Sequence, residues 1–69
     1  MLKDLRIRAG FLTRDSFANA LKTKKYNIDK WETGKAMPRV DMLPKMASVL
    51  NVSMGELVTN LNETKLKGD

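Results

Sequence analysis

The chain contains neither cysteine nor histidine among its 69 residues. Without cysteine it can form no disulfide, and it has no thiolate to act as a nucleophile or to bind a metal ion. Without histidine it lacks the most frequent general base and the most frequent metal ligand of proteins. Its eight carboxylates show no paired arrangement on one predicted helix face, and Gly34 and Lys35 lack the surrounding glycines of a phosphate-binding loop. We therefore predict no enzymatic activity, no catalytic residue, no metal, no cofactor and no small-molecule substrate.

Long apolar runs are missing as well. The first ten residues include four charged ones, Lys3, Asp4, Arg6 and Arg8, and so lack the uninterrupted apolar stretch of a signal peptide or a membrane span. We expect no membrane partner and a cytoplasmic location.

Basic residues are in excess and are unevenly placed. The chain carries 13 Lys and Arg against 8 Asp and Glu, a net charge of +5. Seven basic and three acidic residues lie within 14–39, whereas one basic and three acidic residues lie within 40–64. A chain of this length forms one domain, and the local charge favours a polyanionic partner bound by its middle part.

The spacing of apolar residues predicts an all-α protein of five short helices and gives no sign of a strand. The first helix covers residues 2–9 and ends at Gly10, because glycine readily adopts the left-handed conformation that stops a helix. The second covers residues 14–21 and has Thr13 as its N-cap. The third covers residues 24–32.

The last two helices have clear starting signals. The fourth is predicted over residues 41–50, with apolar residues repeating at helical spacing. Ser53 and Glu56 form a capping-box pattern at the start of the fifth. We expect the folded domain to cover residues 1–61 and residues 62–69 to form a flexible C-terminal tail.

The second and third predicted helices have the spacing of a helix-turn-helix. Ala18 is small enough for close packing of the two helices, and residues 22–24 form the turn. Ile28 and Trp31 point inward at i, i+3 and anchor the third helix, which Gly34 stops. Its outer face then carries hydrogen-bonding side chains: Lys25, Tyr26, Asn27, Asp29 and Lys30.

Over most of its length the sequence resembles the Cro/CI-type helix-turn-helix family, also called XRE-like, of phage and bacterial regulators. The resemblance is carried by Leu5, Arg6, Gly10, Leu12, Thr13, Arg14, Phe17, Ala18, Leu21, the run Ile28 to Glu32, Gly34, Lys35, Pro38, Leu43, Met46, Ala47, Leu50, Val52, Ser53, Glu56 and Leu57. It implies a compact five-helix bundle like the lambda repressor DNA-binding domain. It also implies a sequence-specific regulator, a Cro-like repressor, that reads the major groove of duplex DNA in a bacterial cytosol or a phage-infected host.

The resemblance assigns roles to particular residues. The third helix would face base edges through Lys24, Lys25, Tyr26, Asn27 and Lys30. Contacts near the groove edge and with phosphates would come from Thr13, Arg14, Thr33, Lys35 and Arg39. Arg6 and Glu32 would form an ion pair that links the first helix to the recognition helix.

Base chemistry sharpens two of these assignments. Lysine pairs with the acceptors of guanine, and asparagine pairs with the donor and acceptor of adenine. We therefore expect Lys25 and Asn27 to read bases. Tyr26 either contacts a thymine methyl or a phosphate, or is simply solvated.

Two positions depart from the family pattern. Lys22 stands where many members have glycine, so either it adopts a left-handed conformation or the turn is built differently. Lys24 stands where the recognition helix usually has a serine or threonine cap, a role that Thr23 can take instead.

Assembly and partners leave alternatives open. Operator-level affinity usually requires two copies of so small a domain, so we expect a homodimer at least on DNA. Leu57, Val58 and Leu61 either form its interface or close the core. An alternative function is the antitoxin of a toxin-antitoxin pair, which binds a partner protein as well as DNA, although the predicted tail offers only Leu66 for such a contact.

Overall fold

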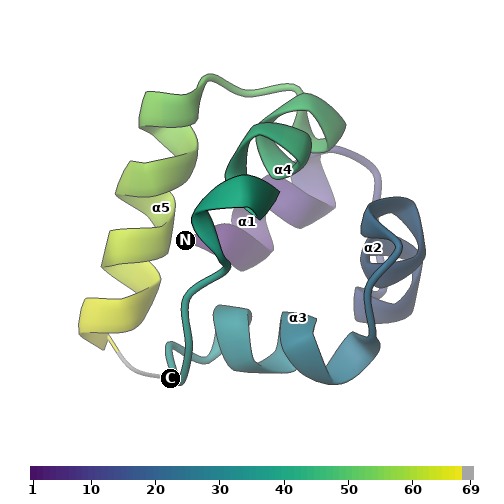
Figure 1. Ribbon diagram of the computed structural model, residues 1–69, viewed down its shortest axis with the longest axis horizontal. Coiled ribbons are helices and arrows are strands. Elements are labelled where there is room, and N and C mark those ends of the chain that lie inside the picture. The colour runs from purple at the N-terminus through teal and green to yellow at the C-terminus, as the bar shows by residue number, and fades with distance from the viewer. Residues whose placement is uncertain (68–69) are drawn as a thin grey trace.

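The computed structural model describes residues 1–67 and contains helices only within that range. Its elements are α1 (Leu2–Arg8), α2 (Arg14–Leu21), α3 (Lys25–Glu32), the 3-10 turn η1 (Val40–Met42), α4 (Leu43–Leu50) and α5 (Met54–Lys67) (Figure 1). They form a bundle of 25 × 24 × 22 Å. The predicted all-α fold of five helices in a compact bundle is confirmed.

Each of the five helices places an apolar stripe in one common core. Leu5, Phe17, Ile28, Met46 and Leu57 come from α1 to α5 in turn, and none is more than 1% exposed. Such a stripe at helical spacing is what drives short helices of this length to pack, because they are marginal in isolation. Ile28 and Trp31, which were predicted to point inward from the third helix, are among the residues that the fold buries.

The local signals at the ends of the helices also act as predicted. Gly10 follows α1 with a left-handed φ of 97°, and Gly34 follows α3 with a φ of 76°. Thr13 caps α2, since its Oγ1 accepts a hydrogen bond of 3.1 Å from the backbone N–H of Ser16.

The turn between α2 and α3 contains a left-handed lysine. Lys22 has φ 56° and ψ 42°, which is the first of the two alternatives that its departure from glycine left open. The N–H of Thr23 donates to the carbonyl of Ala18 at 2.9 Å, and Lys45 of α4 donates to the carbonyl of Leu21 at 2.9 Å. These bonds satisfy the last carbonyls of α2, so the turn closes in spite of its residue type.

Replacing Lys22 with glycine should raise the free energy of unfolding by about 0.5–1 kcal/mol, as measured by urea denaturation. Left-handed backbone costs a residue with a Cβ about 1–2 kcal/mol, and the freedom of glycine in the unfolded chain cancels part of the gain. Asn51, with φ 57° after α4, is the matched control. Because asparagine tolerates this conformation, Asn51→Gly should give a smaller gain or a loss, and an equal or larger gain there would contradict the explanation.

The start of the fourth predicted helix needs a small correction. The chain begins to coil at η1, close to the predicted start at Asp41, but α-helix begins only at Leu43. Pro44 lies in the first turn of α4, where its missing N–H costs nothing. The residues directly before α4 form the 3-10 turn η1 and not a further turn of α-helix.

The predicted end of the fifth helix is wrong. Residues 62–69 were expected to form a flexible tail, but α5 continues to Lys67, while 68–69 lie outside the described residues. The cause is Thr64, which is 1% exposed and accepts a hydrogen bond of 3.0 Å from the backbone N–H of Leu2 at the start of α1. The helix therefore covers the N-terminal end of α1 instead of ending at Leu61, its last buried apolar residue.

Candidate nucleic-acid interface

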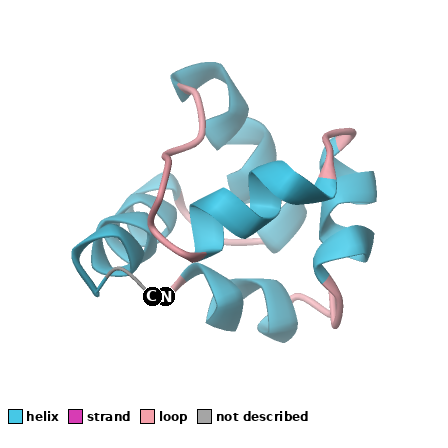
Figure 2. Cartoon of the chain, turned by 90° about the horizontal axis from the view of Figure 1, so that it is seen from below, coloured by secondary structure: helices cyan, strands magenta, loops and turns pink. Residues whose placement is uncertain are grey.

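Helices α2 and α3 form the predicted helix-turn-helix, and α3 lies at one side of the molecule. Figure 1 shows α3 along the bottom edge, and the view from below shows it in front of the other helices (Figure 2). Its inner side is held by Ile28 (0% exposed) and Trp31 (8% exposed), and Ala18 of α2 is 2% exposed. The anchoring roles predicted for these three residues are confirmed. Trp31 belongs to the core and so cannot act as a stacking platform for a nucleic-acid base.

The opposite side of α3 is polar and open to solvent. Lys24, Lys25, Tyr26 and Lys30 are exposed, and Asn27 is half-buried. The Nζ of Lys30 lies 5.3 Å from the centroid of the Tyr26 ring, so the tyrosine carries a cation over its face. All five residues expected on the recognition helix therefore lie on the outer side of α3 or at its start.

Thr23 does not cap α3, contrary to the prediction. Lys24 occupies the N-cap position and makes no side-chain cap bond. The Oγ1 of Thr23 instead accepts a hydrogen bond of 2.8 Å from the Nδ2 of Asn27. Thr23 lies one residue before the N-cap position. Its hydroxyl therefore binds the side chain of Asn27 and does not cap a backbone N–H of α3.

The loop after α3 carries two further exposed cations, of which Arg39 lines a groove together with α3. Lys35 and Arg39 are exposed, and the Oγ1 of half-buried Thr33 donates to the carbonyl of Asp29 at 2.7 Å. A groove of about 390 Å³ runs between α3 and this loop, lined by Thr23, Asn27, Lys30, Trp31, Ala36, Met37, Arg39, Asp41 and Met42. The groove joins Asn27 and Lys30 of the helix to Arg39 of the loop in one continuous surface.

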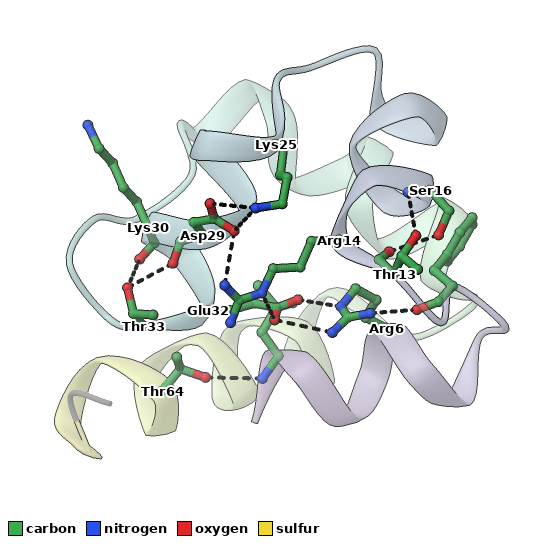
Figure 3. Close-up of polar contacts among 12 residues, drawn as sticks. Arg6, Thr13, Arg14, Ser16, Lys25, Asp29, Lys30, Glu32, Thr33 and Thr64 are labelled. Carbon is green, nitrogen blue, oxygen red and sulfur yellow. Dashed lines mark hydrogen bonds and ion pairs between the residues drawn. The ribbon is translucent and has the colours of Figure 1, made fainter.

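Arg14 has partners within the protein. Its Nε donates to Glu32 at 3.0 Å and its Nη1 donates to Asp29 at 2.9 Å, and its side chain is 32% exposed (Figure 3). Partial burial acts to lower the pKa of this guanidinium, but the hydrogen bonds and charges of Asp29 and Glu32 outweigh burial and raise the pKa. The predicted contact of Arg14 with DNA thus stays a prediction, made by a side chain that already bridges α2 to α3.

Arg6 and Glu32 form a buried ion pair, as the family resemblance implied. Their Nε and Oε2 atoms are 2.6 Å apart, and the two side chains are 5% and 1% exposed. The Nη1 of Arg6 also donates to the carbonyl of Phe11 at 2.8 Å. This pair ties α1 to the last turn of α3 and thereby helps to set the orientation of the exposed face.

Asp29 is the polar residue whose role the sequence analysis missed. Its carboxylate accepts from Arg14 and also from Lys25, whose Nζ lies 3.2 Å from Oδ2. The hydrogen bond from Arg14, followed by that from Lys25, lowers the pKa of Asp29 below its ordinary value. The i, i+4 spacing of Lys25 and Asp29 was the signal available in the sequence.

Two short helices around a tight turn, with the second helix anchored by apolar residues and polar on its open side, define a helix-turn-helix DNA-binding domain. A family model described as Helix-turn-helix matches residues 2–57, and the chain belongs to this family, in its XRE type.

Neither a comparison with curated proteins nor one with solved structures gives a significant match. No helix within the described residues is long and apolar enough to cross a membrane.

Proposed function

We propose that the protein is a Cro-like repressor that binds specific sites in duplex DNA and reads the major groove with α3. The observation that carries the proposal is the division of α3 into two sides. Ile28, Trp31 and Glu32 are each no more than 8% exposed, whereas Lys25, Tyr26 and Lys30 on the other side are open to solvent. A helix held in this way presents its polar side at a constant angle, as reading base edges in a groove requires.

Asn27 is the residue best prepared to read a base. One N–H of its amide is bound to Thr23, which leaves the second N–H and the carbonyl oxygen for another partner. Adenine requires this set, because it offers an acceptor at N7 and a donor at N6 in the major groove. Lys25 and Lys30, with their exposed ammonium groups, suit the acceptors of guanine or nearby phosphates.

Phosphate contacts would flank α3 on both sides. On one side lie Thr13, whose hydroxyl accepts the cap bond and can still donate, and Arg14 at the start of α2. On the other side lie Thr33, Lys35 and Arg39, and Lys24 stands at the start of α3. Such contacts position the domain on DNA without selecting a sequence.

Replacing Lys35 or Arg39 with glutamine should weaken binding to every duplex alike and lower the slope of log affinity against log salt by about 0.9 unit each. When one phosphate contact is lost, binding releases about one counterion fewer. The slope measures the number of counterions released. Fluorescence titrations of a labelled duplex at several salt concentrations measure it.

Arg8→Gln provides the matched control for these titrations. Arg8 lines a hollow with Asn51 and Val52, at the connection between α4 and α5 on the edge opposite α3 (Figure 1). Its loss changes the net charge equally but should leave the slope nearly unchanged. Equal slopes for all three variants, or no binding of the parent chain to any duplex at low salt, would overturn the proposed function.

The proposed function includes a dimer formed at least on DNA, with recognition helices about 34 Å apart on successive turns of the duplex. Leu57 and Leu61 are 0% and 1% exposed within one chain, so they close the core, and of the three candidate interface residues only Val58, at 37%, is open. Selection of bound sites from random duplex DNA would report half-site spacing and symmetry. An asymmetric single half-site would contradict the dimer but not the binding.

A further inference from the structure

Five charged side chains form an alternating chain that runs from the core to the open side of α3. In order they are Arg6, Glu32, Arg14, Asp29 and Lys25, and dashed lines join them in Figure 3. Their exposed fractions are 5%, 1%, 32%, 35% and 52%. The inner members are therefore immobilised by burial, and each outer member is restrained by its neighbours in the chain of contacts.

Asp29 has an unusual place in this chain. It is an acidic residue on the side of α3 that faces the proposed DNA, where a negative charge repels the phosphates. Its two oxygens are both occupied, since Oδ1 accepts from Arg14 of α2 and Oδ2 lies 3.2 Å from the Nζ of Lys25 in the first turn of α3. Asp29 thus weakens the general attraction between the domain and DNA, but it binds two cations at once. This arrangement suits a residue that orients those two cations.

We infer that Asp29 is a positioning residue that determines sequence discrimination by holding Arg14 and Lys25 in one arrangement beside the open side of α3. The inference rests on the proposed function, because it assigns a role within the same DNA-binding surface. Lysine has a long and flexible side chain, so an ammonium group restrained by a carboxylate offers its remaining donors in fewer directions than a free one. Restraint of this kind raises the difference in affinity between a matching and a non-matching base.

The test is Asp29→Asn, which preserves size and removes the charge. Affinity should be measured for a duplex selected by the parent chain and for an unrelated duplex. Binding to the unrelated duplex should rise by about two- to five-fold, because one repelling charge is gone. The ratio between the two affinities should fall by about five- to 150-fold, the range of one specific base contact. A variant that was merely unstable would instead bind both duplexes less well.

Asp15→Asn is the matched control, because Asp15 is an exposed carboxylate in the first turn of α2. It should strengthen binding to both duplexes alike and leave their ratio unchanged. An unchanged ratio for Asp29→Asn, with a parent chain that does discriminate, would overturn the positioning role alone. So would a switch to a different preferred base at one pair, because lost orientation relaxes a preference, whereas a replaced preference marks a direct contact between residue 29 and a base. A parent chain that binds no duplex would overturn both the inference and the proposed function.

Discussion

Replacing Glu32 with alanine should lower the free energy of unfolding by about 3–5 kcal/mol, the usual cost of leaving a buried charge without its partner. The guanidinium of Arg6 would keep its hydrogen bond to the carbonyl of Phe11 but would lose the carboxylate that lies 2.6 Å from its Nε. The side chain of Arg6 is only 5% exposed. Water cannot easily replace that partner. Urea denaturation followed by circular dichroism measures the loss.

The chain contains a matched control for this substitution. Glu56 pairs with Arg8 at 3.3 Å, but the two side chains are 43% and 66% exposed. Glu56→Ala should therefore cost only about 0.2–1 kcal/mol, as exposed ion pairs do. Equal losses for Glu32→Ala and Glu56→Ala would contradict the importance of burial.

A double variant keeps the comparison informative if Glu32→Ala does not fold. Changing Glu32 to leucine and Arg6 to methionine removes both buried charges together, so no unpaired ion remains. This variant should be more stable than Glu32→Ala. A double variant less stable than the single one would mean that the pair supplies more than mutual neutralisation, such as the bond from Arg6 to Phe11.

The sequence predicts the recognition helix well, because its signals are local. Apolar residues at i, i+3 and a glycine after the last turn lie within the helix that they define or directly beside it. Ile28 and Trp31 are buried, and Gly34 follows the helix with a left-handed φ, as predicted. The family resemblance adds the pairing of Arg6 with Glu32, which apolar spacing does not reveal.

The remaining features depend on contacts between distant parts of the chain. Charge alone indicates that Arg14 favours an anion, but it does not indicate whether that anion is a phosphate or a carboxylate brought near by packing. Asp29 lies 15 residues from Arg14 in sequence and meets it only once α2 and α3 have packed. The turn at Lys22 was equally undetermined, because the bond from Lys45 of α4 to the carbonyl of Leu21 arises from tertiary structure.

Thr64 shows the same limit at the C-terminal end of α5. A threonine among polar residues reads as exposed, yet it is buried because the unsatisfied N–H of Leu2, 62 residues away, needs an acceptor. The first amides of any helix lack partners within it, and α1 is only seven residues long. The bond therefore serves both helices at once.

Thr64→Val should lower the free energy of unfolding by about 1–3 kcal/mol, the cost of a buried donor left without an acceptor. Valine matches threonine in shape, so packing is kept while the bonds to Leu2 and to the carbonyl of Asn60 are lost. Thr59→Val, at an exposed position of the same helix, should change stability by less than about 0.5 kcal/mol. Hydrogen exchange should also show the amide of Leu2 becoming less protected in Thr64→Val alone. Equal stability of the two variants would mean that α5 beyond Leu61 does not support α1.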